Sequence, residues 1–293
     1  METIRKAVVA GQFYAGTEDS LQKQIKECFL DERGCGKLPQ ISQGKKNIRG
    51  VVVPHAGYIY SGVIASHAYF QLAANGFADT FIILGPNHSG MGSGVSVMTE
   101  GIWETPLGEV PINAEIAKQI HKGIVDKDET AHSAEHSIEV QLPFLQFMAR
   151  GHGFDFVPIS LMMQDYDTAH EVGNILADAI KKSEQKIVII ASSDFSHAGF
   201  NYRSMPPPGM KVEYYAEKQD KLAISKILEM DPEGLIKTVQ SKNITMCGYG
   251  PVSAMLVAAK ELGATQAELL KYGTSYDVYP GSSCVGYGAL AIY

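Results

Sequence analysis

The sequence lacks the features that mark several large classes of protein. No apolar segment approaches the roughly 20 residues that a membrane-spanning helix needs. There is no run of like charges, and 25 Lys and Arg against 32 Asp and Glu give a net charge of −7. This balance disfavours a nucleic-acid partner, which needs a basic stripe. Because the N-terminus also lacks the apolar core of a signal peptide, we predict a cytoplasmic protein with no membrane or nucleic-acid partner.

Cysteine is scarce, and its spacing supports neither a zinc ribbon nor a thioredoxin-type site. No C-x-x-C pair occurs among the four cysteines, which are Cys28, Cys35, Cys247 and Cys284. Structural disulfides are not expected in a reducing compartment. Three of the cysteines are interpreted as small, buried apolar side chains. Cys247 is different, because it lies just before a predicted helix start at Gly250-Pro251.

Three apolar runs each lead directly into a polar loop that carries a histidine. The runs are residues 51–53, 81–84 and 187–191, and the histidines are His55, His88 and His197. Continuous apolar runs are typical of parallel strands that are buried on both faces. Ligands bind beyond the carboxyl ends of such strands. We therefore expect the three loops to meet at one edge of a sheet and to form a site.

The remaining pattern predicts an α/β protein. Amphipathic segments alternate with the strands, two more strands follow at about 268–275 and 285–292, and no repeat or low-complexity linker interrupts the chain. We predict a three-layer α/β/α sandwich with a mixed, largely parallel central sheet, formed by residues 1–293 as a single domain. Ser61 is predicted to cap a helix over 63–74, and residues 103–108 are interpreted as a turn-rich crossing.

His55 and His88 are candidate metal ligands. Each alone fits a buried histidine that bonds to a loop carbonyl, but as a pair beyond two apolar strands they favour a metal that takes neutral imidazole. The third ligand is open between Glu135, Asp194 and Cys247. A helix N-terminus lowers the pKa of a thiol, so we expect thiolate to be accessible at Cys247. The alternative is a packed cysteine.

Further polar residues are candidates for acid–base chemistry or for support of the ligands. Asp194 lies three residues before His197, where a carboxylate can orient a histidine and raise its basicity. The alternative is a loop cap beside an exposed histidine. A serine hydrolase built on Ser192 or Ser193 is ranked low, because no G-x-S-x-G elbow is present. The remaining candidates around the pocket are Glu135, His136 and Tyr58.

Five motifs, taken together, resemble the MEMO family essentially from end to end. They are Pro54-His55-Ala56-Gly57-Tyr58, Leu84-Gly85-Pro86-Asn87-His88, Glu135-His136-Ser137-Ile138-Glu139, Ser192-Ser193-Asp194-Phe195 with His197, and Cys247-Gly248. The family is similar in fold to class III extradiol dioxygenases, which hold non-haem iron(II) with two His and one Glu.

The resemblance implies roles for individual residues. His55 and His88 match the two metal histidines of the family, and Cys247 matches the third position near the metal. Asp194 and His197 match residues that line the same pocket, and His197 resembles the acid–base histidine of the dioxygenases. A thiolate in place of the dioxygenase Glu suits copper(I) as well as iron(II).

The expected function is that of a cytosolic metalloprotein with one iron or copper ion and dioxygen-dependent redox activity. One alternative is an extradiol-type dioxygenase acting on a small aromatic diol. Another is a non-enzymatic module that binds a peptide or small ligand in the same pocket, since animal members resemble adaptors for phosphotyrosine peptides. Microbial members tend to be encoded beside radical-SAM and AMMECR-type proteins, which implies a functional link to them.

Overall fold

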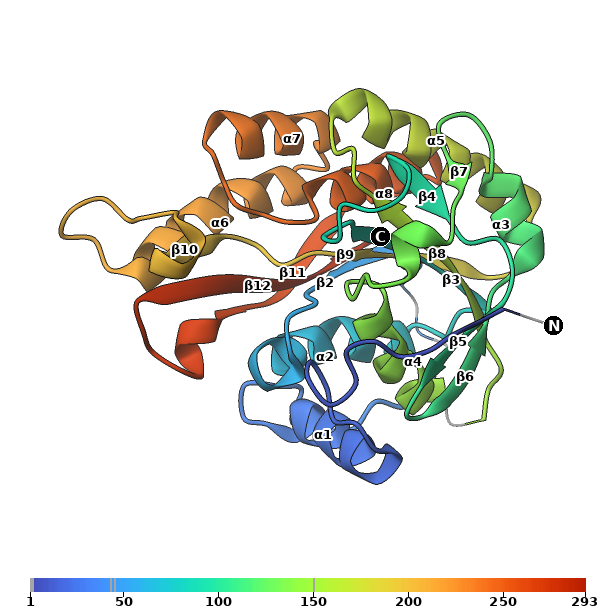
Figure 1. Ribbon diagram of the computed structural model, residues 1–293, viewed down its shortest axis with the longest axis horizontal. Helices are drawn as coiled ribbons and strands as arrows, with labels where there is room; N and C mark the ends of the chain where they lie inside the picture. The colour runs from blue at the N-terminus through green and yellow to red at the C-terminus, as the bar shows by residue number, and fades with distance from the viewer. Residues whose placement is uncertain (1–2, 43, 45, 150) are drawn as a thin grey trace.

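The protein, described by a computed structural model over residues 3–42, 44, 46–149 and 151–293, is built around a mixed sheet. Within these residues nine strands belong to this sheet, with β10 at one edge and β7 at the other (Figure 1). Their order is β10 (His197–Gly199), β12 (Ser283–Ile292), β2 (Gly50–Val53), β9 (Ile187–Ser192), β3 (Thr80–Pro86), β8 (Asp155–Leu161), β4 (Val95–Val97) and β7 (Asp126–Lys127), with β11 (Ala267–Thr274) paired to β12.

The three strands predicted to carry histidine loops are neighbours at the centre of this sheet. β2 and β3 both pair with β9 in parallel, so Val53 lies beside Ser192, and Leu84 lies beside Ala191. Every residue of β2, β3 and β9 is buried, as expected for a parallel sheet covered on both faces. The three loops beyond these strands therefore lie along one edge, as predicted.

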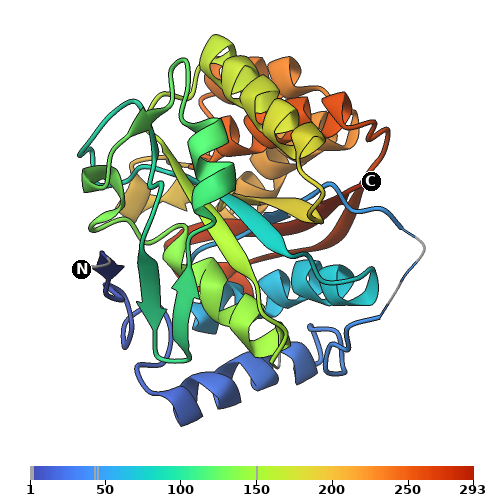
Figure 2. The ribbon, with the colours of Figure 1, turned by 90° about the vertical axis from the view of Figure 1, so that its right-hand side faces the viewer.

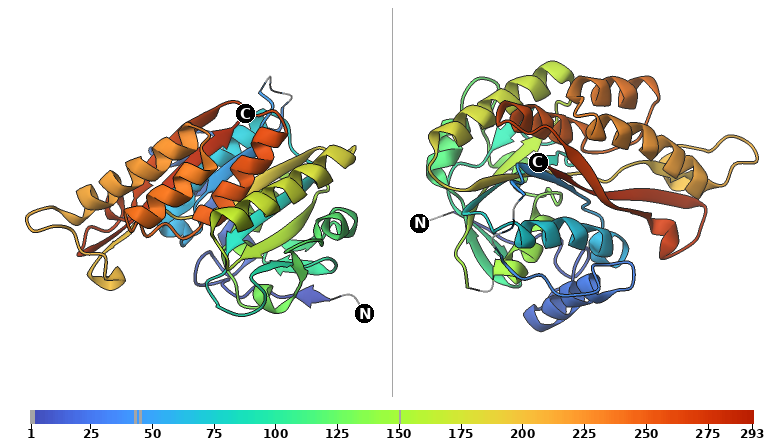
Figure 3. Two further views of the ribbon diagram at one scale, coloured as in Figure 1. Left: turned by 90° about the horizontal axis from the view of Figure 1, so that it is seen from above. Right: turned by 180° about the vertical axis from the view of Figure 1, so that it is seen from behind.

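Helices cover both faces of the sheet, which confirms the three-layer α/β/α prediction. One layer contains α1 (Glu18–Leu30), α2 (Tyr58–Ala74) and α4 (Leu142–Ala149), and Figure 2 shows it below the sheet. The other layer contains α3 (Ala114–Ile120), α5 (Tyr166–Lys182), α6 (Val212–Leu228), α7 (Pro232–Ser241) and α8 (Tyr249–Glu261), of which α5 to α8 lie side by side in Figure 3. Within the described residues, no helix is long and apolar enough to cross a membrane.

A second, smaller sheet replaces the predicted turn-rich crossing. β5 (Ile102–Thr105) and β6 (Gly108–Pro111) form a hairpin, and β1 (Ile4–Arg5) pairs in parallel with β5. The turn residues Pro106 and Leu107 are present as expected, but the strands on either side are only four residues long. They pair with each other, and β5 also pairs with β1, about a hundred positions away, which no local pattern reveals.

The start of α2 also differs from the prediction. The helix begins at Tyr58 directly after the histidine loop, with Gly57 as its N-cap. Ser61 lies inside the first turn, where its hydroxyl donates to the carbonyl of Ala56, so it does not cap a helix that starts at residue 63. This early start leaves only residues 54–57 between β2 and α2 to form the His55 loop.

Candidate metal centre

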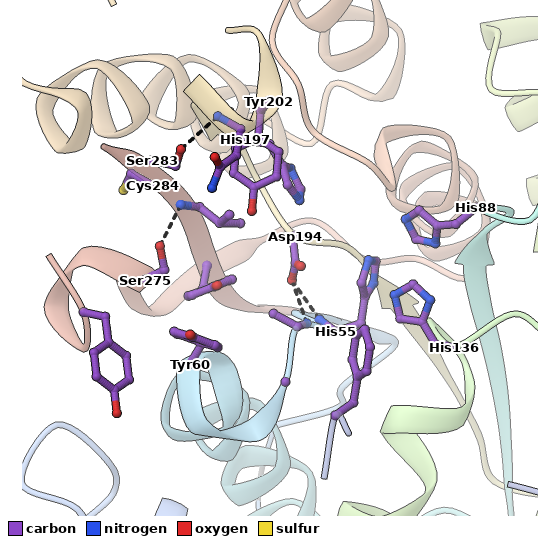
Figure 4. A pocket seen from close by; sticks show the side chains of 17 residues that line it. His55, Tyr60, His88, His136, Asp194, His197, Tyr202, Ser275, Ser283 and Cys284 are labelled. Carbon is purple, nitrogen blue, oxygen red and sulfur yellow. Dashed lines mark hydrogen bonds between the residues drawn. The ribbon is translucent and has the colours of Figure 1, made fainter. Parts of the chain in front are cut away.

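The carboxyl ends of the central strands open into a cavity of about 490 Å³ (Figure 4). Its wall combines the loops after β2, β3 and β9 with the segment that joins β11 to β12. The lining residues are Phe13, His55, Ala56, Gly57, Tyr60, His88, His136, Asp194, His197, Asn201, Tyr202, Ser275, Tyr279, Ser283, Cys284, Val285 and Tyr287. The site is thus assembled from segments that are distant in sequence.

His55, His88 and Cys247 form a group that could hold one metal ion. One ligand atom from each lies within 4.8 Å of the other two, and the Sγ atom of Cys247 is 3.2 Å from Nε2 of His55. Nitrogen and sulfur ligands about 2.1 and 2.3 Å from one tetrahedral ion lie about 3.5 Å apart. The spacing therefore fits a single ion. Cys247 is not among the described residues that line the cavity, although its sulfur lies this close to His55, which does line it.

The tautomer of each histidine leaves Nε2 without a hydrogen, as a metal ligand requires. The Ser192 hydroxyl gives its proton to the carbonyl of Ser137, at 2.7 Å, so it accepts the hydrogen of His55 Nδ1 at 2.8 Å. Nδ1 of His88 is 2.9 Å from Oε1 of Glu135, an acceptor. A hydrogen bond at Nδ1 fixes the ring and increases the basicity of the opposite nitrogen.

Glu135 is fully buried and bonds to the His88 loop at several points. Its carboxylate accepts from the backbone N–H groups of His88 and Ser137 and from the ring of His88. Burial acts to raise the pKa of Glu135, but the hydrogen bonds and charge of His88 and the bond from Ser137 prevail and lower the pKa to about 2. Glu135 also groups with His88 and His136 within 4.8 Å. Its closest partners make it a support for His88.

The expected low pKa of the Cys247 thiol is wrong for the protein without metal. Burial, followed by the negative charge of Asp194, raises the pKa of Cys247 well above its ordinary value. The hydrogen bond from the Asp194 backbone N–H to Sγ, at 3.2 Å, opposes this only in part. Helix α8 has Gly248 as its N-cap, so Cys247 precedes the helix, and the helix dipole does not outweigh the burial.

Asp194 and His197 lie in the same cavity but do not form the predicted pair. Oδ1 of Asp194 accepts from the backbone N–H groups of His55 and Ala56, at 2.8 and 3.3 Å. Nδ1 of His197 lies 3.0 Å from the carbonyls of Phe195 and Thr245, so it carries the hydrogen. Asp194 therefore holds the His55 loop, while carbonyl groups orient His197 and leave its Nε2 free to accept a proton. Burial raises the pKa of Asp194, and the nearby His197 opposes this shift.

The remaining predicted residues have different positions. His136 lines the cavity and stacks on His88 with ring centroids 4.7 Å apart, and burial lowers the pKa of His136 to about 4. The Ser193 hydroxyl donates to the carbonyl of Asp194 and accepts from the N–H of Gly248, so it supports the loop beside Cys247. Tyr58 does not line the cavity. It points into the core, where its hydroxyl donates to the carbonyl of Val140 and its ring packs on Phe144.

Sequence reasoning missed the aromatic part of the wall. Tyr202, Tyr279 and Tyr287 line the cavity together with Tyr60 and Phe13. In Figure 1, β11 and β12 extend beyond the rest of the sheet as a hairpin, and the turn of this hairpin brings residues 275–287 to the cavity. The one available signal was the group of tyrosines at 272–287, because no metal-binding or catalytic motif occurs there.

Comparison with known proteins assigns the chain to a family. The family model described as Memo-like protein matches residues 5–291. The chain belongs to the Memo-like family. It is 48% identical to a MEMO1 family protein of Methanococcus vannielii over 296 residues, which cover 99% of both chains. It is 45% identical to one from Methanopyrus kandleri over 289 residues, or 98% of both chains.

A solved structure supports the fold of this Memo-like protein. An uncharacterized protein of Escherichia coli K12 has a TM-score of 0.57 to the chain at 16% sequence identity. The match covers 84% of this chain and 100% of that one. At this identity the likeness shows the α/β fold alone.

Proposed function

We propose that this Memo-like protein is a metalloprotein that holds one iron or copper ion at His55, His88 and Cys247 and uses it in redox chemistry with dioxygen. The observation that carries the proposal is the convergence of one atom from each of the three side chains within 4.8 Å. Two imidazoles and a thiol form a softer ligand set than two imidazoles and a carboxylate, and such a set suits copper(I) as well as iron(II). A bound ion of this kind would supply the site for dioxygen and the electrons.

The residues around the three ligands have distinct tasks in this proposal. Ser192 and Glu135 fix the rings of His55 and His88 through Nδ1. Asp194 fixes the backbone of the His55 loop. His197 faces the cavity with Nε2 free and Nδ1 bonded to carbonyl groups, so it can take a proton from a ligand and return it.

The raised pKa of Cys247 has a consequence for metal uptake. A metal binds the thiolate, so each ion that enters must displace the proton of Cys247. Metal affinity should therefore rise with pH across the neutral range. The hydrogen bond from the Asp194 N–H to Sγ partly stabilises the thiolate and is already formed before a metal binds.

Metal content after anaerobic expression tests the proposal. We expect close to one iron or copper ion per chain in the wild type and a loss of that ion in Cys247→Ala. Cys284→Ala is the matched control, because Cys284 lines the same cavity but is not part of the ligand group. Equal metal content in the wild type and Cys247→Ala would refute the assignment of Cys247 as a ligand.

A pocket that binds a peptide or small ligand without catalysis is a second candidate, favoured by the cavity of about 490 Å³, a size typical of small-molecule sites. Wild-type protein that is purified metal-free and refuses added iron(II) and copper(I) would support it. The aromatic wall favours a third, narrower candidate, the ring cleavage of a small aromatic diol. A yellow product from catechols with bound iron(II) would support this reaction, and no product from any catechol tested would count against it.

A further inference from the structure

The cavity wall has an unusual charge composition. Among its described lining residues there is no lysine or arginine, and Asp194 is the one carboxylate. Four histidines also line the wall: His55, His88, His136 and His197. The wall therefore offers no lysine or arginine to a carboxylate or phosphate group, which proteins commonly bind with arginine.

Asp194 has one oxygen available for a ligand. Oδ1 accepts from the backbone of His55 and Ala56, whereas Oδ2 accepts no hydrogen bond from the described part of the chain. In Figure 4, Asp194 lies near the middle of the lining residues, between His55 on one side and Tyr202 on the other. Because Asp194 lines the cavity, an N–H donor of a ligand in the cavity can bind this oxygen.

Tyrosine rings surround the approach to this carboxylate. Tyr60, Tyr202 and Tyr279 are exposed by 38%, 42% and 60%, so they form the outer part of the wall, and the rings of Tyr60 and Tyr279 are 5.9 Å apart. The faces of tyrosine rings attract cations and also pack against flat apolar groups. Burial, followed by the charge of Asp194, raises the pKa of the hydroxyls of Tyr202 and Tyr287.

We infer that the cavity takes a ligand with a flat aromatic body and a protonated amine. The ammonium group donates to the free oxygen of Asp194, and the body packs between the tyrosines of the outer wall. Ligands that carry a carboxylate or phosphate at the same position are disfavoured. This inference rests on the proposed function in one respect, because it assigns a ligand class to the same cavity.

Three probes of the same shape test this inference. Tyramine, para-propylphenol and para-hydroxyphenylpropionate place an ammonium, a methyl or a carboxylate group at the end of the same two-carbon chain. None has a diol that would chelate a metal. Their affinities are measured by calorimetry with wild-type protein, both metal-free and loaded with iron(II). The variant Asp194→Asn removes the charge, and Asp178→Asn makes the same change on a side chain that is 58% exposed on α5.

The expected result is that tyramine binds at least about tenfold more tightly than either other probe, the factor that a charge-assisted hydrogen bond supplies. Asp194→Asn should remove this preference, and Asp178→Asn should keep it. Equal affinities, tighter binding of the carboxylate, no binding of any probe, or a preference that survives in Asp194→Asn would overturn the inference. The wild-type ranking holds whether or not Asp194→Asn folds.

The two proposals fail separately in this experiment. Bound metal without a preference for tyramine would refute the ligand class alone. A preference for tyramine in protein that refuses iron(II) and copper(I) would refute the metal centre alone.

Discussion

Replacing Glu135 by Gln should show how far the hydrogen bonds that hold His88 contribute to stability and to metal binding at the proposed centre. In the native site Oε1 accepts from the His88 ring and from the N–H of Ser137, and Oε2 accepts from the N–H of His88. Glutamine has one acceptor oxygen, so in either orientation its amide group faces an N–H donor. Because Glu135 is fully buried, water cannot replace the lost acceptor.

The size of the effect follows from the bonds that are lost. A hydrogen bond to a charged group contributes about 1.5–3 kcal/mol, so Glu135→Gln should lower the free energy of unfolding by about 2–3 kcal/mol. The loss of a carboxylate behind a metal histidine typically weakens metal binding by about 10- to 100-fold. The exposed Glu129, in the same loop, gives the control variant Glu129→Gln, which should change neither quantity.

The pH dependence of stability provides an independent check. The pKa of Glu135 is lowered in the folded protein from its ordinary value of 4.5 to about 2. Because this pKa is lowered in the folded state, the ionised Glu135 contributes about 3 kcal/mol to the free energy of unfolding. The contribution is fully present above pH 4.5 and is lost as the pH falls toward 2. Denaturant titrations between pH 2 and 6 should show a weaker acid dependence in Glu135→Gln. An unchanged acid dependence together with unchanged metal affinity would refute the role given to Glu135.

Three further predictions concern other buried ionisable groups. Arg5→Ala should lower the free energy of unfolding by about 3–5 kcal/mol in denaturant titrations. The variant leaves the carboxylate of Glu139, which lies 2.6 Å from the guanidinium in the native protein, buried without its cation. Lys6→Ala removes an exposed ion pair and should have little effect. Metal binding to the wild type at pH 7 should release about one proton per ion, as measured by calorimetry in buffers of different ionisation enthalpy. Binding without proton release would contradict the protonated thiol. Asp220→Asn should stabilise the protein above pH 6. Burial raises the pKa of Asp220 to about 6, so the stability that its protonated carboxyl group contributes is lost as the pH rises from 3.8 to 6. Denaturant titrations at pH 7 that show a less stable variant would contradict this.

Much of the central architecture is encoded locally and was predictable. β2, β3 and β9 are continuous apolar runs, and the rule that ligands bind beyond parallel strands placed His55, His88 and the Asp194 loop at one edge. The β5–β6 hairpin was missed because it is stabilised by pairing with β1, far away in sequence. The single domain over residues 1–293 and the choice between iron and copper stay predictions.

The properties of individual site residues depend on tertiary burial and were not predictable. The sequence places Cys247 near a helix start, but only the folded structure shows that burial and Asp194 raise the pKa of its thiol. The same limit applies to Tyr58, which follows the histidine loop in sequence yet points into the core. The tyrosines of the cavity wall reach it through a hairpin whose direction no local pattern specifies.

The most direct test of the metal centre is X-ray absorption spectroscopy on the anaerobic protein loaded with copper(I) or iron(II). Our account predicts one sulfur ligand at about 2.3 Å and two imidazole nitrogens at about 2.0–2.1 Å. The sulfur contribution should vanish in Cys247→Ala and persist in Cys284→Ala. A spectrum of the wild type with only nitrogen and oxygen ligands would contradict the assignment of Cys247, and with it the proposed two-histidine, one-cysteine centre.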